Sequence, residues 1–441
     1  MEIYLEWYLT LSILLGSLLL LLLTGMPIAF SFILLSVVLV FIMWGGNEGI
    51  ELLIGTLFTH VTSFTLLPLG LFILMGETLF HSGLAPRMID AIDKWLGNLP
   101  GRLGLLSVAS GILFSTLTGA SVASTALLGS LLTPEMEKRG YKKPMSLGPI
   151  IGSGGLAIMI PPTALGVLLA SVAYISIGKL LIAIIIPGIL MATLYAIYII
   201  LRCKLEPSIA PPYAVSHHSL SSKMVTTAKY ILPVGVIIFL VTGVIIFGIA
   251  TPSEAAATGA LGVYILAAFY GKLNWELLKK SVAGTVNITG MLFMILAGAI
   301  IYSQVVAFSG AGRGLAGFVM GLPVDPIITV ISIQIVVLLL GMFIATTGII
   351  LIIIPLVMPI VEALGIDPIW FSVIFLINIE MATTTPPFGA CLFVMKGVAP
   401  PDTTMGDIIR AALPFLGCDL IAIVMIFIFP QLTSWLPSMM N

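Results

Sequence analysis

The sequence overlies itself when it is shifted by 225 residues, and the positions that coincide are helix-breaking prolines. Random placement of 27 prolines among 441 residues would produce on average fewer than one such match. The coinciding prolines are Pro27 with Pro252, Pro134 with Pro359, and the pair Pro161-Pro162 with Pro386-Pro387. The shift predicts a duplicated unit, and breakers at equivalent places in two hydrophobic halves are typical of the binding site of a secondary transporter.

Composition identifies the solvent of this chain as a lipid bilayer. Hydrophobic residues make up 59% of the sequence and charged residues 8%, and the mean hydropathy is +1.21. Apolar runs of helix length recur at 7–23, 28–44, 180–201, 230–250 and 411–429. These runs exclude the weak alternating segments of a β-barrel, so the sequence predicts an all-α polytopic membrane protein. No cleavage pattern follows the first run, which we expect to be a retained helix.

Basic residues border an apolar stretch that is predicted to turn back inside the membrane. Loops rich in Lys and Arg stay in the cytoplasm. One basic loop runs from Arg87 to Arg102 and the next from Lys138 to Lys143, with the apolar stretch at about 103–133 between them. Its centre is small and polar, which suits a tight turn buried in protein, so we predict a re-entrant hairpin. A single crossing helix with a small-residue packing face is the alternative.

The duplicate of this stretch, at about 327–361, is predicted to form a second hairpin. Its bordering loops hold only Arg313 as a basic residue, so this hairpin is expected to enter from outside. Each unit then has five crossings and one hairpin, and an odd number of crossings inverts the second unit. With both termini in the periplasm, 16 of the 18 Lys and Arg residues become cytoplasmic. The predicted units are 1–201 and 230–441, joined by a cytoplasmic linker at 202–229.

A second interruption follows each hairpin, within predicted broken helices at about 147–175 and 369–395. Pro161-Pro162 and Pro386-Pro387 each remove two backbone donors, which unwinds the helix and frees carbonyl oxygens inside the membrane. A hard cation such as Na⁺ is satisfied by several such oxygens together with a hydroxyl, and half-helix amino termini at the same place favour an anionic substrate. Prolines that only kink the helices to fit their neighbours are the alternative.

Few ionisable residues fall within the predicted crossings, where a charge near mid-bilayer costs at least about 2.5 kcal/mol. They are Glu77, Glu380 and Asp419. Glu380 lies next to the second break, and two readings of it stay open: it tunes the site or carries a proton, or it caps a broken half-helix.

Two short amphipathic segments are predicted to lie in the membrane plane, at 46–60 and 272–286. One falls between the second and third crossings of each unit. Such interfacial arm helices would join a static scaffold to a moving domain made of the hairpins and broken crossings. That arrangement is an elevator-type carrier.

Five segments carry a resemblance to a known family. They are Ala250-Thr251-Pro252-Ser253-Glu254-Ala255-Ala256-Ala257, Thr118-Gly119-Ala120-Ser121, Thr133-Pro134-Glu135-Met136-Glu137-Lys138-Arg139-Gly140-Tyr141, Ile160-Pro161-Pro162 and Thr385-Pro386-Pro387-Phe388-Gly389. On these motifs the chain resembles, over essentially its whole length, the large (M, DctM-like) membrane subunit of TRAP transporters, the tripartite ATP-independent periplasmic carriers of the ion-transporter superfamily.

The resemblance implies Na⁺-coupled import of a small organic acid, a carboxylate or sulfonate, across the bacterial inner membrane. A periplasmic substrate-binding protein (P type) would deliver the acid, and a small four-helix membrane subunit (Q type) would complete the complex. Some members carry the small subunit fused in front of the large one. Here Met1 starts almost at the first crossing, so a separate small subunit is expected.

The resemblance also implies two Na⁺ sites and a substrate site between the hairpin tips. One departure concerns Ala345, where many relatives carry Asp before the paired threonines, and it leaves the second ion's affinity or the ion count open. The first Na⁺ site would comprise Thr118, Ser121, Ser124, Ala157, Ile160 and Pro162. The second would comprise Thr346, Thr347, Gly348, Ala382, Thr385 and Pro387. The substrate residues would be Gly119, Ala120, Gly155, Glu380 and Thr384.

Other function classes fit the sequence less well. An ATP-driven pump lacks its Gly-rich loop ending in Gly-Lys-Ser or Gly-Lys-Thr. An intramembrane enzyme would need converging catalytic groups or metal ligands, and charge is too scarce. A standalone Na⁺-coupled carboxylate carrier of the same superfamily is the main alternative, because its inverted repeat and hairpins would look alike.

Overall fold

The computed structural model of the protein describes residues 6–43, 46–118, 121–212 and 219–440, and every regular element within these ranges is a helix. The first half contains α1 (Trp7–Leu23), α2 (Ile28–Met43), α3 (Asn47–Val61), η1 (Phe64–Leu66), α4 (Leu67–His81), α5 (Ala85–Leu96), α6 (Arg102–Thr118), α7 (Ser121–Lys138), α8 (Lys143–Met159), α9 (Ala164–Val172), α10 (Ile177–Ala183), α11 (Ile185–Leu205), η2 (Pro207–Ile209) and α12 (Leu220–Tyr230).

The second half follows a similar order of helices. It contains α13 (Leu232–Ile246), α14 (Pro252–Phe269), α15 (Trp275–Phe308), α16 (Ala311–Met320), α17 (Pro326–Gly341), α18 (Thr346–Ala363), α19 (Pro368–Thr384), α20 (Ala390–Val398), α21 (Met405–Ile428), α22 (Gln431–Ser434) and η3 (Pro437–Met439). Both bounds of α7 and α18, and both bounds of α8 and α19, differ by 225 residues. The sequence shift therefore extends to the ends of these helices, while the inversion of one half relative to the other stays a prediction.

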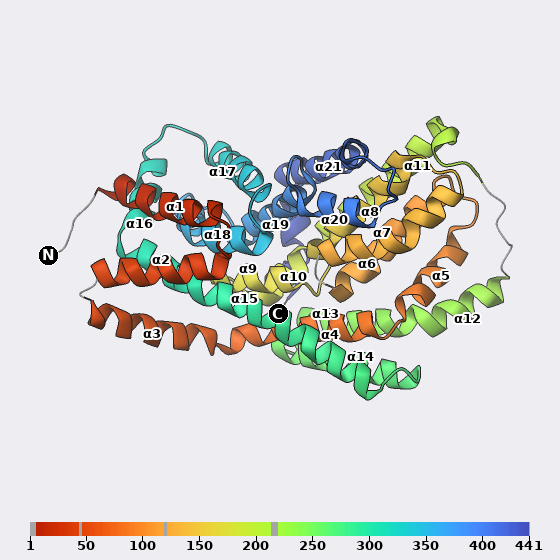
Figure 1. Ribbon diagram of the computed structural model, residues 1–441, viewed down its shortest axis with the longest axis horizontal. Helices are drawn as coiled ribbons and strands as arrows, with labels where there is room; N and C mark the ends of the chain where they lie inside the picture. The colour runs from red at the N-terminus through yellow and green to blue at the C-terminus, as the bar shows by residue number, and fades with distance from the viewer. Residues whose placement is uncertain (1–5, 44–45, 119–120, 213–218, 441) are drawn as a thin grey trace.

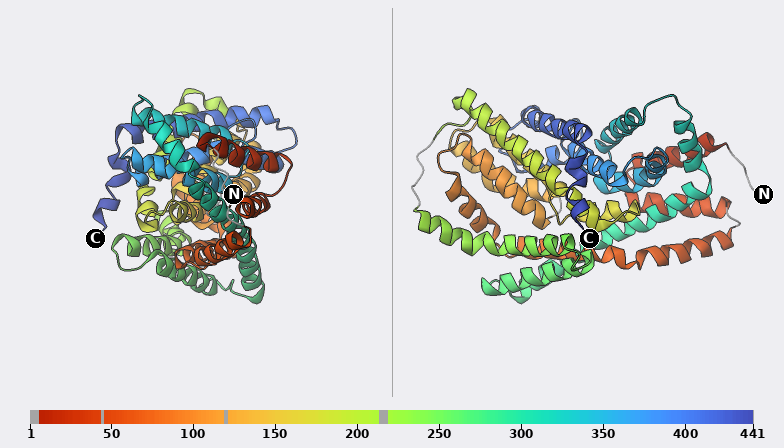
Figure 2. Two further views of the ribbon diagram at one scale, coloured as in Figure 1. Left: turned by 90° about the vertical axis from the view of Figure 1, so that its left-hand side faces the viewer. Right: turned by 180° about the vertical axis from the view of Figure 1, so that it is seen from behind.

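The predicted hairpins, α6–α7 and α17–α18, lie in the same part of the molecule as the broken helices, α8–α9 and α19–α20. In Figure 1, α3, α4, α13 and α14 lie along the lower side, and α6 to α8 and α17 to α20 lie above them. The view from behind in Figure 2 has the same two groups. Helix α15 packs against α2 and α4, and α14 packs against α4, while α8 packs against α6, α7, α19 and α21. The two broken helices therefore touch each other at the centre of the upper group.

Five of the described helices are long and apolar enough to cross a bilayer, and two bent helix pairs raise this number to seven. One bent pair is α8 and α9, whose axes differ by 46° across a short break. Further apolar helices, including α1, α2, α17 and α19, are shorter. The chain is a multi-pass helical membrane protein, while the count of five crossings per unit stays a prediction.

The two predicted interfacial arms differ in structure. The first is the separate helix α3, whereas the second, predicted at 272–286, is continuous with the following crossing in the 34-residue helix α15. In the first half, Pro68 in the first turn of α4 has no N–H group and separates the two helices. The equivalent stretch of α15 contains no proline, so its hydrogen-bond ladder continues. A separate second arm was therefore a wrong prediction.

The predicted linker at 202–229 is largely helical where the structure describes it. Helix α11 continues to Leu205, and α12 packs against α5. Lys94 Nζ donates to Thr226 Oγ1 at 2.9 Å, and Trp95 Nε1 donates to Thr227 Oγ1 at 2.6 Å. The linker is thus attached to the first half through α12.

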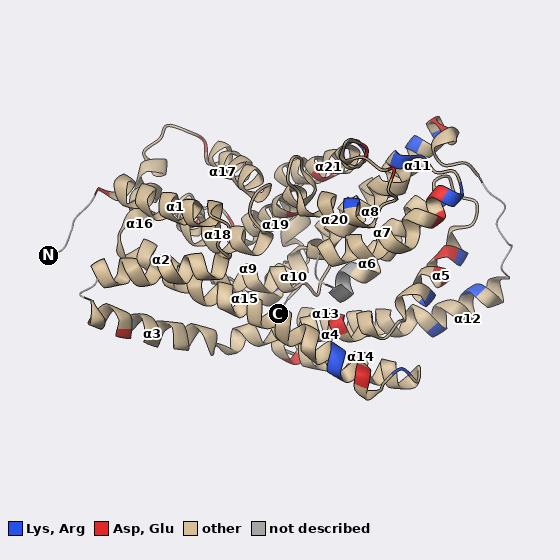
Figure 3. Ribbon diagram, viewed as in Figure 1, with Lys and Arg blue, Asp and Glu red and all other residues tan. Residues whose placement is uncertain are grey.

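Basic residues concentrate at one end of the molecule, over α5, α12 and the ends of α7, α8 and α11 (Figure 3). The two basic loops that border the first hairpin therefore lie at the same end. Lys143 binds there to Glu137 at 2.7 Å and to Asp402 at 2.9 Å, which joins the α7–α8 turn to the loop after α20. Its hydrogen bond lowers the pKa of the Asp402 carboxyl. That this end faces the cytoplasm stays a prediction.

Equivalent exposed residues at the ends of α7 and α18 provide a test of the inverted topology. Lys138→Cys is expected to react with a membrane-impermeant maleimide only from the cytoplasm, and Ala363→Cys only from the periplasm, because opposite hairpins would enter from opposite faces. The native Cys203, Cys391 and Cys418 are buried, which keeps the background low. Labelling of both introduced cysteines from the same side would reject the inversion.

Candidate ion and substrate site

The start of α7 lies directly against the broken helix α8. At Gly154, a side chain would collide with the Thr125 hydroxyl and would lie 3.2 Å from the Ser121 carbonyl oxygen. Glycine therefore lets the amino-terminal turn of α7 approach the middle of α8. The first hairpin and the first break therefore pack against each other.

The first break exposes backbone oxygens because of its two prolines. Helix α8 ends at Met159 and α9 begins at Ala164. In a continuous helix the carbonyls of Ala157 and Ile158 would accept from residues 161 and 162, but both of these are prolines and have no N–H. Ala157, a predicted Na⁺ ligand, is fully buried, so its carbonyl oxygen lies inside the protein without its helical donor.

The second break repeats this arrangement with added hydroxyl groups. Because residues 386 and 387 are prolines, the carbonyls of Ala382 and Thr383 have no helical donor. The Ala382 carbonyl instead accepts a long, 3.3 Å bond from the Thr385 N–H. The hydroxyls of Thr384 and Thr385 both donate to the Met381 carbonyl, at 3.0 and 2.6 Å. Because their hydrogens are used in this way, the hydroxyl lone pairs remain available to a cation.

The tip of the second hairpin contacts the second break. The rings of Phe343 and Phe388 lie 5.2 Å apart, and a side chain at Gly341 would meet the Ala382 methyl group. Thr346, Thr347 and Gly348 form the first turn of α18, whose N–H groups have no partner within the helix. Ala345 is the N-cap residue of this helix and has no side-chain acceptor to offer them.

Glu380 connects the two halves at this point. Ser121 Oγ donates to Glu380 Oε2 at 2.7 Å, and Thr383 Oγ1 donates to Oε1 at 3.2 Å. The side chain is fully buried, and a methyl group at Gly155 would lie 3.2 Å from Oε1. No ion pair in the described part of the chain involves Glu380. Among the described residues, its bonds go to hydroxyl groups of the hairpin and of its own helix rather than to the N–H groups of a helix end.

The structure places most of the sequence-predicted site residues in this region. Ser121, Gly155 and Glu380 meet at the contact between the halves, and Ala382 meets the second hairpin. Ser124 on α7 is fully buried, and Ile160 ends α8 as its C-cap. Thr118 ends α6, while Gly119 and Ala120 lie outside the described residues. The roles of all these residues as ion or substrate ligands stay predictions.

Two buried side-chain hydrogen bonds near the site were not predicted from the sequence. Asn378 Nδ2 donates to the backbone oxygen of Gln334 at 2.6 Å and to its side-chain oxygen at 2.8 Å, which joins α19 to α17. The Tyr195 hydroxyl donates to Asp419 Oδ1 and joins α11 to α21. A single polar residue inside an apolar run was the available signal for Gln334.

The donor set suits an alkali or alkaline-earth cation better than a transition metal. No cluster of three His, Cys, Asp or Glu side chains that could hold a metal occurs among the described residues. The breaks instead supply backbone carbonyl and hydroxyl oxygens, the ligand type that hard cations prefer.

Comparisons with known proteins agree with this architecture. Residues 15–432 match the family described as "Tripartite ATP-independent periplasmic transporter, DctM component". The chain is 30% identical to the C4-dicarboxylate TRAP transporter large permease protein DctM of Vibrio cholerae, across 94% of this chain and 95% of that protein. It is 28% identical to the sialic acid TRAP transporter large permease protein SiaM of the same organism, across 95% and 96%.

A solved structure has a similar fold. The YdaH transporter of Alcanivorax borkumensis superposes with a TM-score of 0.65 at 15% identity, covering 96% of this chain and all of that one. At this identity the likeness concerns the fold alone.

Proposed function

The chain belongs to the DctM family of TRAP transporter large permeases, and from that membership we propose that it imports a small organic acid by Na⁺ coupling. Relatives with this fold are transporter permeases for organic acids such as C4-dicarboxylates and sialic acid, not enzymes. The proposed substrate of this chain is a carboxylate or sulfonate that a periplasmic binding protein delivers. A small four-helix membrane subunit would complete the transporter in the inner membrane.

One observation carries the Na⁺ proposal: two prolines interrupt a buried helix at equivalent places in both halves, each time beside the tip of a hairpin. Each interruption leaves two carbonyl oxygens without helical donors. In a bilayer such oxygens need a partner, and a dehydrated Na⁺ supplies one. The ligands proposed are the hairpin residues and break residues at Ser121 and Ala157 on one side, and at Thr346 and Ala382 on the other.

Helix amino termini would hold the anionic substrate. Helices α7 and α18 both begin at hairpin tips, so the positive dipole ends of their first turns lie at the proposed site. Glu380 would act as a positioning residue that holds the first hairpin against the second broken helix. In this proposal the carboxylate or sulfonate binds between the two tips.

The driving force would be electrical as well as chemical. Two Na⁺ ions entering with a monovalent acid carry one net positive charge inward, which contributes about 2.3 kcal/mol per 100 mV of membrane potential. The hairpins and broken helices would move as one body against α3, α4 and α13 to α15. The contact of both broken helices with each other supports their movement as a unit.

Uptake into proteoliposomes tests the proposal. We expect a panel of organic acids to enter vesicles that hold this chain and its small subunit only when the binding protein and an inward Na⁺ gradient are both present. Uptake that needs neither Na⁺ nor the binding protein would contradict the proposal. Uptake with Na⁺ but without the binding protein would instead identify a standalone carrier.

Ala345 offers a gain-of-function prediction at the second site. Ala345→Asp is expected to cap α18, which stabilises a helix by about 1 kcal/mol, and to place a carboxylate beside Thr346 and Thr347. We expect the half-saturating Na⁺ concentration of uptake to fall several-fold, since about 1.4 kcal/mol corresponds to tenfold in affinity. Ala345→Ser is the matched control, because serine caps the helix without adding charge. An equal effect of both substitutions would assign the gain to helix stability alone.

A further inference from the structure

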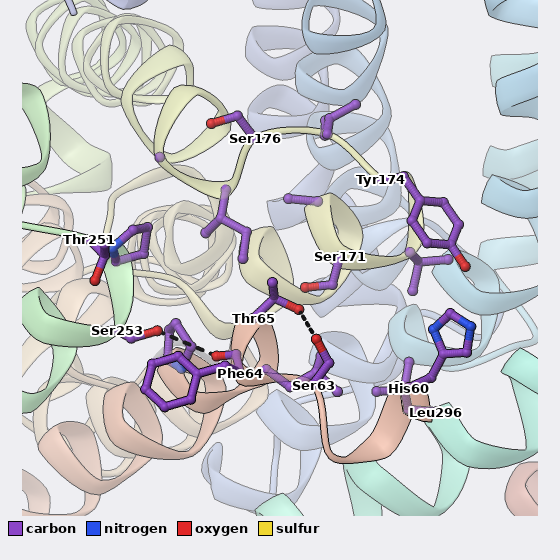
Figure 4. Close-up of a pocket in the computed structure, with 18 of the residues that line it drawn as sticks. His60, Ser63, Phe64, Thr65, Ser171, Tyr174, Ser176, Thr251, Ser253 and Leu296 are labelled. Atoms are coloured by element: carbon purple, nitrogen blue, oxygen red, sulfur yellow. Dashed lines mark hydrogen bonds between the residues drawn. The ribbon is translucent and has the colours of Figure 1, made fainter. Parts of the chain in front are cut away.

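A cavity of about 990 Å³ lies between the lower group of helices and α9, α10 and α18, and none of the proposed ion ligands is among its lining residues. Its volume is at the upper end of the range for ligand pockets, about 300–1,000 Å³. The close-up in Figure 4 has His60 and Tyr174 on one side and Thr251 and Ser253 on the other, with Ser63, Thr65 and Ser171 between them. The lining therefore comes from both halves of the chain.

The lining combines apolar side chains, here called the apolar wall, with polar side chains, here called the polar rim. Leu66, Leu296 and Leu351 contribute to the wall, from η1, from α15 and from α18. The rim is rich in hydroxyl groups and includes His60. Glu254 is the acidic member, and no Lys or Arg lies among the described lining residues. An anionic headgroup or a free organic acid would meet a carboxylate here without a compensating lysine or arginine.

Glu254 has one oxygen left for a ligand. Its Oε2 accepts bonds from the Thr251 N–H and hydroxyl, both at 2.8 Å, in the capping box of α14. No bond to Oε1 occurs within the described ranges. Since the capping bonds hold this carboxylate at the rim, its second oxygen is positioned to accept from an ammonium group.

Tyr174 marks the mouth of the cavity. It is the one described non-glycine residue with a positive φ, 55°, and its side chain is 80% exposed. Its ring lies 6.4 Å from that of His60, across the gap between α3 and the α9–α10 turn. A left-handed conformation costs roughly 1–2 kcal/mol for a residue with a side chain, so the fold holds an exposed aromatic ring at this mouth against its backbone preference.

We propose that this cavity binds one zwitterionic phospholipid with a primary amine, of the phosphatidylethanolamine type. One acyl chain would lie against the apolar wall. The ammonium group would bind Glu254, and the phosphate would bind hydroxyl groups of the polar rim on the same side of the cavity as Thr251. Because α15 and α18 both contribute to the wall, the lipid touches the static and the moving group in the proposed transport cycle.

Photolabelling of the purified full chain tests this site without any transport step. The chain is reconstituted in vesicles of equal phosphatidylethanolamine and phosphatidylglycerol, each lipid supplied in turn with a photoreactive acyl chain. We expect the phosphatidylethanolamine probe to label peptides around Leu66 and Leu296 in preference to the phosphatidylglycerol probe. Labelling spread evenly over all lipid-facing helices, or preference for phosphatidylglycerol, would overturn the proposal.

Two matched pairs of variants sharpen the test. Ser171→Trp fills the cavity and should reduce labelling about tenfold, equivalent to about 1.4 kcal/mol. Ser12→Trp, on exposed α1, should not change it; both serines donate to the carbonyl four residues earlier. Glu254→Gln keeps the helix cap and should remove the preference between the lipids, whereas Glu276→Gln, a surface partner of Lys280, should keep it.

Folding is checked independently by size-exclusion elution and thermal melting. If Ser171→Trp fails to fold, Ser303→Trp fills the same cavity from α15. Unchanged labelling in folded cavity-filling variants would reject the site, and equal lipid preference in Glu254→Gln and wild type would reject the headgroup assignment. Since labelling requires neither Na⁺ nor substrate, either failure leaves the proposed transport function untouched.

Discussion

A chain with Pro161 and Pro162 both replaced by alanine is expected to take up its organic acid no faster with a Na⁺ gradient than without one. Alanine at both positions restores two N–H groups, which can then bond the Ala157 and Ile158 carbonyls and continue α8. Oxygens used in a helix ladder no longer bind the ion. Interactions with charged groups contribute about 1.5–3 kcal/mol each, so each lost ligand weakens Na⁺ binding about 10- to 100-fold.

The measurement is the initial rate of uptake in proteoliposomes as a function of external Na⁺. Pro134→Ala is the matched control, because Pro134 lies inside α7 on the same side of the molecule yet away from the break. Thermal melting verifies that the double variant folds. If its half-saturating Na⁺ concentration equals that of the wild type, the first break is a structural kink and holds no ion.

The second large effect is expected at the contact between Ser121 and Glu380. Both Ser121→Ala and Glu380→Gln are expected to reduce uptake by at least about tenfold, because a hydrogen bond to a buried carboxylate contributes about 1.5–3 kcal/mol. Ser121 and Glu380 are 259 residues apart in sequence, and their hydrogen bond joins the first hairpin to the second broken helix. Loss of this bond would leave the hairpin tip free to shift from the ion ligands.

A double-mutant cycle measures the coupling. We expect the combined variant to be little worse than either single variant, with a coupling energy above the average of about 0.6 kcal/mol for polar pairs within membranes. Ser130→Ala on the same helix is the control, since the Ser130 hydroxyl donates to the Leu127 carbonyl of its own helix. Strictly additive effects would show that Ser121 and Glu380 act separately and that their contact does not position the site.

Much of the architecture could be predicted because it depends on local covalent chemistry. A proline has no N–H wherever it stands in the fold, so the paired prolines locate the ends of α8 and α19 without any knowledge of their neighbours. The position of the two basic loops at the same end of the molecule could also be predicted, because charged side chains avoid the hydrocarbon core of the membrane. The prediction of a separate second arm was wrong because α15 has no proline equivalent to Pro68, so its backbone hydrogen bonds continue from the arm into the crossing.

The contacts that build the site depend on distant segments and could not be read from spacing. Glu380 left two readings open, and only the packing of α19 against α8 brings it to Ser121 and Gly155. The bond between Asn378 and Gln334 and the cavity beside Glu254 arise in the same way.

By itself the sequence determined the bilayer as solvent, the repeated helix breaks and the family, because hydropathy and missing backbone donors act residue by residue. The tertiary structure decided which carboxylate, hydroxyl and carbonyl groups meet. In a chain that is apolar almost throughout, hydrophobicity does not distinguish one helix pairing from another, and close packing of small residues and buried hydrogen bonds selects the partners.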